Sequence, residues 1–306
     1  MRFEKWQALG NDYLIVEHDQ LPFALTAVRL RRLCEGHLGV FADGVLELAR
    51  PEEPPHVADL RIYNPDGSEA ELSGNGAREA ILYLRHRGWT DQDTFSIHTA
   101  AGPIHANITG RFSCRVDMGR ARLTSRDFPA GPADGVGELR IAAAVDAGDS
   151  PPAMIWRFQH VSIGNPQCAI AVADAAALAA LDLPAVGPAI EGHAEFPNRT
   201  NVSWFTELDP GPPARIRARV FERGVGETLS SGTGATGAAI AYVLGAARGS
   251  PRKPPAGGAH VLVSLDGGEL EVEVDGDLHV HLSGWALPVF EGRLSEELLK
   301  ELEGLG

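Results

Sequence analysis

The sequence predicts an α/β protein built from two similar halves, and three observations lead to this prediction. The chain has 306 residues, which is the length of two ordinary domains. The predicted order of elements is the same in both halves: a strand, a glycine-rich serine loop, a helix and three short strands. The loop itself is repeated, because Ser73–Ala77 (SGNGA) matches Ser231–Ala235 (SGTGA) at an offset of 231 − 73 = 158 residues. We therefore expect a duplicated protein with two pseudo-symmetric domains.

In the first half, alternating apolar residues and turn residues set the expected elements. Thr26 is expected to cap a helix that ends near Gly36, and a second helix is expected from Asn75 to Arg87, ended by Gly88. The expected strands are Arg2–Ala8, Tyr13–Val16, Val45–Ala49, Leu60–Tyr63, Thr94–Thr99, Ile104–Thr109 and Ser113–Met118.

The second half shows the same pattern. A helix of small residues is expected from Gly234 to Ala247, ended by Gly249. A last helix over Ser295–Glu303 carries a stripe of leucines and is expected to pack on the body. The expected strands are Arg215–Glu222, His260–Leu265, Leu270–Asp275 and Leu278–Leu282.

Stretches rich in proline and glycine mark the breaks in the chain. The stretch 127–137 lies near the midpoint, whereas 209–213 and 250–258 are expected to be surface loops. We expect one domain over residues 1–121, with the segment 287–306 packed on it, and a second over residues 122–286. The active site is expected in a cleft between them, with Ser73 and Ser231 facing each other across one small molecule.

The composition excludes several classes of partner. A formal charge of −14 disfavours nucleic acid, because the phosphate backbone is also negative. The three cysteines are scattered without C-x-x-C spacing, as in a protein of a reducing compartment, and the chain has no apolar run long enough for a membrane span. We expect a cytoplasmic protein with no membrane partner. His279 and His281 alternate on one expected strand, but no third ligand is evident from the sequence, so no metal is expected.

Each glycine-rich loop opens a helix, and this has a physical use. The start of a helix offers amide groups and a partial positive charge, and glycine lets a ligand approach the backbone closely. Two such helix starts would suit a small anionic, amino-acid-like substrate held from both sides. One loop alone would be an ordinary capped turn; the second, equivalent copy is what favours a binding site.

At this point the residues resemble the diaminopimelate epimerase family. The blocks that carry the resemblance occur in the family's order over nearly the whole chain: Leu9–Asp12, Asn64–Ser68, Ser73–Arg78, Gly164–Pro166, Asn201, Glu222–Gly224 and Gly226–Gly234.

The resemblance implies a fold of two similar domains, each a β-sheet wrapped around a central helix. It implies a homodimer that epimerises LL-diaminopimelate to the meso form, in lysine biosynthesis, without pyridoxal phosphate or another cofactor. In the family two cysteines exchange the α-proton, and Ser73 and Ser231 occupy their positions. The implied substrate-binding residues are Asn11, Asn64, Gly74, Asn75, Asn165, Asn201, Glu222, Arg223, Gly232 and Thr233.

The sequence departs from the family in ways that keep the reaction open. Both catalytic cysteines are serines, Gln167 replaces a histidine, and Gly44 replaces a glutamine near the substrate, which is expected to enlarge the cleft or admit water. A serine ionises several pKa units above a thiol, so it needs a neighbouring base. Proximity in sequence suggests three candidates for that base: Glu79, Glu227 and His160.

Three functions therefore remain open. The first is an amino-acid isomerase, the second a lyase, dehydratase or different isomerase on the same fold, and the third a non-catalytic binder of an amino acid. Exchange of the α-proton with solvent distinguishes them.

Overall fold

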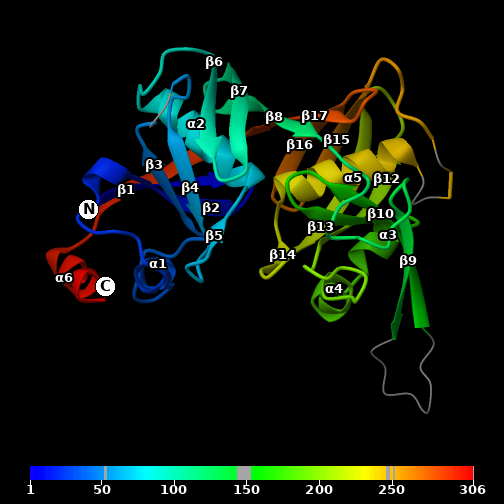
Figure 1. Cartoon of the computed structure of the whole chain (residues 1–306), viewed down its shortest axis with the longest axis horizontal. Coiled ribbons are helices and arrows are strands. Elements are labelled where there is room, and N and C mark those ends of the chain that lie inside the picture. The colour runs from blue at the N-terminus through cyan, green and yellow to red at the C-terminus, as the bar shows by residue number, and fades with distance from the viewer. Residues whose placement is uncertain (52–53, 143–152, 246–248, 251, 306) are drawn as a thin grey trace. The chain divides into compact units, whose positions relative to one another are not determined.

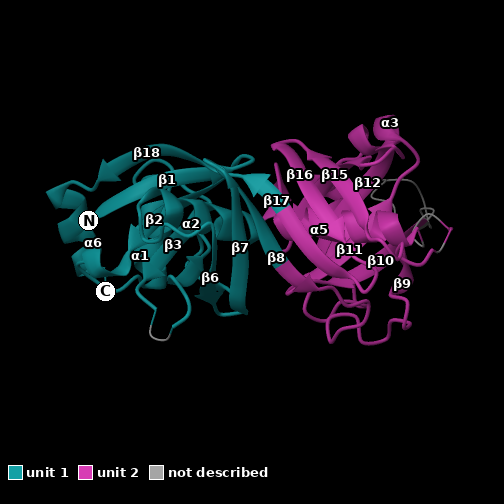
Figure 2. Cartoon of the chain, turned by 90° about the horizontal axis from the view of Figure 1, so that it is seen from above, with its two compact units in different colours: residues 1–117, 283–306 teal, residues 118–282 magenta. Residues whose placement is uncertain are grey.

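A computed structural model describes residues 1–51, 54–142, 153–245, 249–250 and 252–305. The chain forms two compact units, shown in different colours in Figure 2. Unit 1 comprises residues 1–117 and 283–306, and unit 2 comprises residues 118–282. The chain passes between the units within β8 (Ser113–Arg120) and again within β17 (His279–Trp285). The stretch 127–137 therefore lies inside unit 2.

Unit 1 is a twisted sheet that packs on one central helix. In the sheet, β1 pairs antiparallel with β18 and β2, β2 runs parallel to β3, β3 and β4 are antiparallel, and β4 runs parallel to β6 before the antiparallel β7 and β8. The strand bounds are β1 Arg2–Ala8, β2 Asn11–Glu17, β3 Val45–Ala49, β4 Asp59–Tyr63, β5 Glu69–Ala70, β6 Thr94–Thr99, β7 Gly102–Gly110 and β18 Leu287–Arg293.

The central helix of unit 1 is α2 (Gly74–His86), which Figure 1 shows against the strands. It contacts β1, β2 and β3, and every residue from Gly74 to Leu84 is buried. A helix that is buried on all sides needs small or apolar residues around its whole circumference. Its first turn meets this need with the glycines and alanine of the repeated loop, so the motif both packs and caps the helix.

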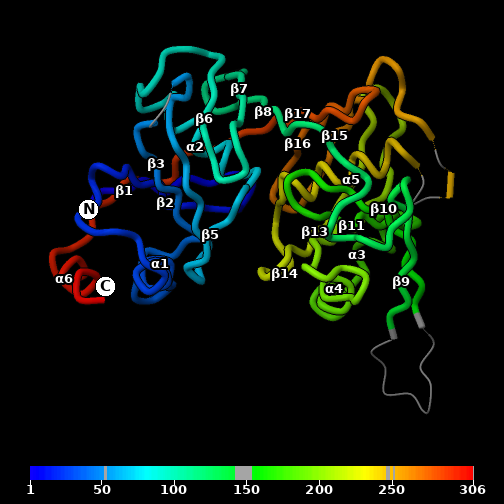
Figure 3. Tube along the Cα trace, viewed as in Figure 1, coloured from blue at the N-terminus to red at the C-terminus, as the bar shows by residue number. Residues whose placement is uncertain are grey.

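Two outer helices close the far end of unit 1. Thr26 caps α1 (Ala27–Cys34), and Ser295 caps α6 (Glu296–Gly304). The guanidinium of Arg29 donates hydrogen bonds to the carbonyls at the end of α6, 2.8 Å to Leu302 O and 3.1 Å to Glu303 O. Leu302 is fully buried in the same core cluster as Leu30. The segment 283–306 therefore belongs to unit 1, as the red end of the trace beside α1 in Figure 3 also shows.

Unit 2 repeats this plan. β10 pairs antiparallel with β9 and β11, β11 runs parallel to β12, β12 and β13 are antiparallel, and β13 runs parallel to β15 before the antiparallel β16. The strand bounds are β9 Val136–Ala142, β10 Ala153–Ser162, β11 Pro166–Ala171, β12 Asn201–Asp209, β13 Ala214–Glu222, β14 Gly226–Thr228, β15 Ala259–Leu265 and β16 Gly268–Val274. Unit 2 also has two outer helices, α3 (Ala175–Ala179) and α4 (Leu183–Glu191). Unit 1 has one short 3-10 helix, η1 (His18–Gln20).

The central helix of unit 2 is α5 (Gly232–Leu244), which contacts six strands and is buried along almost its whole length. The two units share the same parallel and antiparallel order of strands. In both, a short strand (β5 or β14) pairs back on the strand before it and leads into the central helix. The mixed α/β fold with two similar halves is thus confirmed.

One predicted helix end is wrong. We expected α5 to reach Ala247 and to be ended by Gly249, but it ends at Leu244. Gly245 follows with φ +65°, a left-handed conformation that glycine adopts without strain, and its amide bonds back to Ala241 O and Tyr242 O. Ala247 lies outside the described residues. Among the described residues, no helix has the length and apolar character needed to cross a membrane.

Candidate functional site

Ser73 stands directly before α2, in the extended conformation of a helix cap. Its Oγ accepts a hydrogen bond from Gly76 N at 3.0 Å, which satisfies one of the amides at the start of the helix. It also accepts a hydrogen bond from the Tyr13 hydroxyl at 3.2 Å. With two bonds accepted by its oxygen, Ser73 keeps its own proton to donate.

Around this cap, three expected substrate-binding residues lie in one network. The Asn75 amide donates to Asn11 Oδ1 at 3.2 Å, and Asn11 donates to Asp43 Oδ2 at 2.8 Å. Arg78, which is fully buried, donates to Asn75 Oδ1 at 2.6 Å and to Gly74 O at 3.1 Å. Asn11 and Asn75 are thus held in fixed orientations at the start of α2.

Asn64 directly follows β4 and starts the turn to β5. Its amide donates to Ser68 Oγ at 2.9 Å, and its backbone NH bonds to Ser68 O at 2.9 Å. These contacts hold the turn that leads to Ser73. They give Asn64 a structural role within unit 1, in addition to the substrate contact that the resemblance implies.

The expectation that Gly44 opens space is wrong. A Cβ added at Gly44 would lie 2.2 Å from Tyr63 O and 2.7 Å from Tyr13 Cε1, closer than real contacts allow. The neighbouring ring of Tyr13 is itself buried. Gly44 therefore makes room for the Tyr13 ring rather than for water or substrate.

Ser231 caps α5 as Ser73 caps α2, with its Oγ accepting from Gly234 N at 3.2 Å. Its hydroxyl, however, donates to a carboxylate: Ser231 Oγ is 3.1 Å from Glu222 Oε2. The other carboxylate oxygen of Glu222 accepts from Thr228 Oγ1 at 2.9 Å. Glu222 ends β13 and Thr228 ends β14, so the hairpin between them aims the carboxylate at the start of α5.

Beside this cap, Asn165 donates to Thr233 Oγ1 at 3.2 Å and accepts from Gln167 Nε2 at 2.7 Å. This arrangement parallels the Asn11–Asn75 contact in unit 1. In both units an asparagine after a glycine bonds the second residue of the central helix. Gly74 and Gly232 are buried first residues of their helices.

Asn201 and Arg223 are joined through the backbone. Asn201 Oδ1 accepts from Arg223 N at 2.8 Å, and its amide donates to Pro166 O at 3.1 Å. The Arg223 guanidinium is exposed and donates to Asn198 O at 3.1 Å. A buried carboxylate, Glu191, accepts from Gly224 N at 2.7 Å and fixes the same turn. Asn201 and Glu191 therefore position the hairpin that carries Glu222.

The three bases suggested by sequence proximity have other surroundings. Glu79 is fully buried on α2, where burial raises the pKa of its carboxyl well above the usual range. Glu227 pairs with Arg219 at 2.6 Å. His160 contacts Ser125 Oγ at 2.9 Å, and burial lowers the pKa of its imidazole to about 4. The side chains that hydrogen-bond the two serines are instead Tyr13, which donates to Ser73, and Glu222, which accepts from Ser231. The sequence analysis named neither of them as a base or as a proton donor.

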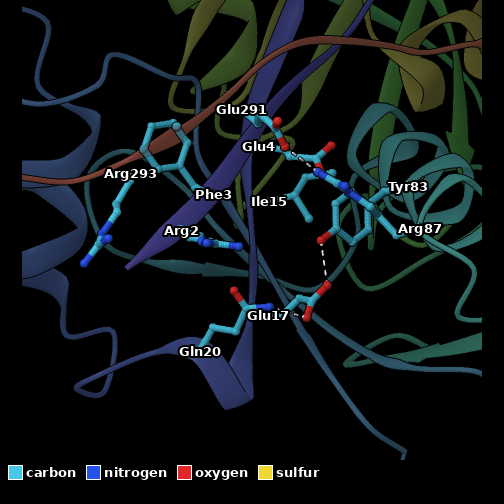
Figure 4. A pocket seen from close by; sticks show the side chains of 11 residues that line it. Arg2, Phe3, Glu4, Ile15, Glu17, Gln20, Tyr83, Arg87, Glu291 and Arg293 are labelled. Carbon is cyan, nitrogen blue, oxygen red and sulfur yellow. Dashed lines mark hydrogen bonds and ion pairs between the residues drawn. The ribbon is translucent and has the colours of Figure 1, made fainter.

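A hollow of about 560 Å³ opens elsewhere on unit 1, at the far end of α2 (Figure 4). It is lined by residues of β1, β2 and β18, together with Tyr83 and Arg87 near the end of α2. Arg87 pairs with Glu4 and, at 2.8 Å, with Glu291, and Tyr83 donates to Glu17 at 2.8 Å. The hollow contains none of the expected site residues and is separated from Ser73 by the length of α2, roughly 20 Å.

The two alternating histidines of β17 do share a face. The rings of His279 and His281 lie with centroids 5.2 Å apart, and both residues are half-buried. The absence of a metal stays a prediction.

The duplicated unit with one buried central helix is a fold that other proteins share. In solved structures, the fold resembles a phenazine biosynthesis protein of the PhzF family from Bacillus anthracis (17% identity, TM-score 0.64, 96% of this chain and 99% of that one). It also resembles a probable proline racemase from Agrobacterium radiobacter K84 (16% identity, TM-score 0.63, 96% of this chain and 93% of that one). These similarities show the shared fold.

Sequence comparison is more specific. The family model of diaminopimelate epimerase matches residues 3–124 and 159–284. The chain is 38% identical to the diaminopimelate epimerase of Synechococcus sp. (strain JA-3-3Ab) over 302 residues, which covers 97% of this chain and 99% of the relative. It is 39% identical to that of Desulforudis audaxviator, covering 96% and 99%.

The fold and these relatives place the chain in the class of amino-acid isomerases that work without pyridoxal phosphate. Within this class, the chain belongs to the diaminopimelate epimerase family.

Proposed function

We propose that this chain interconverts the LL and meso epimers of diaminopimelate, with Ser231 and Ser73 exchanging the α-proton on opposite faces of one α-carbon. The single observation that carries the proposal is the hydrogen bond from Ser231 to Glu222. It supplies the base that a serine needs where a thiol would ionise unaided.

The Glu222 contact avoids a free alkoxide. As Ser231 takes the α-proton from carbon, its own proton moves to Glu222, so the carbon–hydrogen bond breaks while a carboxyl O–H forms. Ser73 then gives its proton to the other face, and the new carbon–hydrogen bond completes the inversion. Solvent takes the proton from Glu222 and returns one to the Ser73 side. The reverse reaction retraces these steps: with Glu222 protonated and the Ser73 side deprotonated, Ser73 takes the α-proton and Ser231 gives carbon a proton that Glu222 replaces.

The starts of the two central helices stabilise the negative charge that develops on the substrate. Removing an α-proton puts negative charge on the substrate's carboxylate, and the positive ends of α2 and α5 stabilise charge of that sign. The substrate-binding set implied by the resemblance supports the same substrate, because Asn64, Asn201, Glu222 and Arg223 correspond to the grip on its distal amino-acid end. In this chain Glu222 would then serve both the serine and the substrate.

The experiment is exchange in deuterium oxide. LL- and meso-diaminopimelate are each incubated with the protein, and α-proton loss is followed by NMR together with the ratio of epimers. We expect deuterium at the inverted centre, and inversion lowered on the order of 10²-fold or more in Ser73→Ala and in Ser231→Ala.

Two outcomes would reject the proposal. Loss of water or ammonia would favour a lyase, and tight binding without exchange would favour an amino-acid binder. The homodimer, the cytoplasmic location and the place in lysine biosynthesis stay predictions, and sedimentation velocity tests the first of them.

A further inference from the structure

The two units differ in which titratable side chain hydrogen-bonds the serine at the start of the central helix. In unit 2 the partner is Glu222, which comes from the end of β13. The equivalent position in unit 1 is Asn64, directly after β4, and its amide donates to Ser68 instead. A side-chain amide does not ionise near neutral pH and cannot act as an acid or a base there, so a titratable group in unit 1 has to come from another element.

That element is β2. Tyr13 lies two residues after Asn11 and donates its hydroxyl to Ser73 Oγ at 3.2 Å. The equivalent position in unit 2, two residues after Asn165, is Gln167, whose amide bonds Asn165. Each unit thus has one titratable group on its serine, and the two groups come from non-equivalent positions.

Gly44 is what admits the phenol. The ring of Tyr13 packs so closely that a Cβ at position 44 would lie 2.7 Å from Cε1 and 3.0 Å from Cδ1. The glycine is held in place, because Leu14 N donates to Gly44 O at 3.0 Å in the β2–β3 pairing. A larger residue at position 44 would clash with Tyr63 O, at 2.2 Å, as well as with the Tyr13 ring, so the ring can approach this closely only beside a glycine.

We propose that Tyr13 is the positioning residue that makes Ser73 an effective acid, by donating a hydrogen bond and then a proton to the Ser73 oxygen. This inference rests on the proposed function. When Ser73 gives its proton to the α-carbon, the Tyr13 proton moves to Ser73 and leaves a phenolate, which regains a proton from solvent as Glu222 releases the α-proton to solvent. A phenol is intrinsically more acidic than an aliphatic hydroxyl, which favours this transfer.

Tyr13→Phe tests the proposal, because it keeps the ring against Gly44 and removes only the hydroxyl. Since the equilibrium between epimers is unchanged, inversion should fall equally in both directions, by at least roughly 10-fold, as expected for one lost hydrogen bond to a developing charge. Tyr83→Phe is the matched control, since it removes a buried hydroxyl that bonds Glu17 and not Ser73.

Exchange without inversion separates a role at Ser73 from general damage. In Tyr13→Phe, the epimer whose α-proton faces Ser231 should still exchange with solvent at the wild-type rate. The epimer whose α-proton faces Ser73 should lose exchange, because in that direction Ser73 acts as the base and the Tyr13 phenolate is the group that takes its proton. Equal loss for both epimers, or no loss for either, would overturn the role of Tyr13 while leaving the proposed function standing.

A second measurement does not depend on turnover. With tyrosine labelled with ¹³C at Cζ, the Tyr13 signal is assigned by its disappearance in Tyr13→Phe. It should shift in Ser73→Ala and stay in place in Ser231→Ala. If the wild type inverts no diaminopimelate, the proposed function fails, and this signal still decides the Tyr13–Ser73 pairing: a Tyr13 signal unmoved by Ser73→Ala overturns it.

Discussion

The hydroxyl of Ser231 donates to the carboxylate of Glu222, with Ser231 Oγ 3.1 Å from Glu222 Oε2. The two residues are neighbours because β13 ends at Glu222, turns back as β14 and leads into α5 at Ser231. A helix cap and a hairpin end thereby form one hydrogen-bonded pair. A residue that the family resemblance assigns to the substrate also contacts the proposed catalytic serine.

Replacing Glu222 by glutamine should abolish most of the proposed activity. Glu222→Gln keeps the size of the side chain but removes the group that can take the Ser231 proton. We expect inversion to fall on the order of 10²-fold to 10⁴-fold, the usual range for a positioned acid or base. Exchange of the diaminopimelate α-proton by NMR measures it.

Glu227→Gln is the control for that change, because Glu227 belongs to the same hairpin but pairs with Arg219. It should leave inversion within a few-fold of the wild type. Equal losses in the two variants would mean that the hairpin, and not the Glu222 carboxylate, is what matters.

Restoring sulfur should raise the rate. A thiol has a pKa near ~8.5, several units below a serine hydroxyl, and each unit corresponds to about 1.4 kcal/mol. We expect Ser73→Cys combined with Ser231→Cys to invert diaminopimelate faster than the wild type. A double variant with unchanged slow turnover in the α-proton exchange assay would argue that this chain's substrate is another molecule.

The wild type should resist thiol reagents. All three cysteines are buried, and burial raises the pKa of the Cys34 and Cys114 thiols to about 12 and that of Cys168 well above its usual range. Because the thiolate is the reactive form, iodoacetamide at pH 8 should leave activity intact. Mild oxidant should also leave it intact, since two serines form no disulfide. Ser231→Cys is the positive control, and inactivation of the wild type in step with labelling of a native cysteine would contradict the site.

His160 should make the fold sensitive to acid. Its pKa is lowered to about 4 by burial, from a usual value of 6.5. The unfolded chain therefore binds the extra proton first, and stability falls as pH falls from 6.5 toward 4, by up to roughly 3–4 kcal/mol. Urea unfolding should show that the free energy of unfolding of the wild type falls toward that of His160→Gln over this pH range. The variant is therefore relatively more stable at low pH. Parallel curves for the two proteins would exclude this role.

Glu79 should make the fold less stable as the pH rises, which is the opposite of the effect of His160. Burial raises the pKa of its carboxyl, so the folded state keeps the proton that the unfolded chain releases above pH 4.5. Folding is therefore penalised increasingly as pH rises, by up to about 1.4 kcal/mol per pH unit. Glu79→Gln should gain stability relative to the wild type between pH 5 and 8 in the same assay. Glu297→Gln, at an exposed position of α6, should show no such trend.

Much of the fold was predictable because its signals are local. Alternation predicted strands such as Arg2–Ala8, and Thr26, Ser73 and Ser295 marked helix starts through their side-chain oxygens. The end of α5 was missed because two glycines, Gly245 and Gly249, offer the same signal, and only the hydrogen bonds of Gly245 decide between them. The hydrogen-bond partner of each serine was missed for a related reason. Tyr13 lies 60 residues before Ser73, and no local pattern relates the two.

The sequence by itself determined the duplication, the capped glycine loops and the family, because each is written in the order of residues along the chain. Tertiary structure alone decided that Glu222 contacts Ser231, that Tyr13 contacts Ser73, and that the Tyr13 ring occupies the space beside Gly44. The physical reason is that proton transfer depends on distances of about 3 Å between atoms that strand pairing and helix packing bring together.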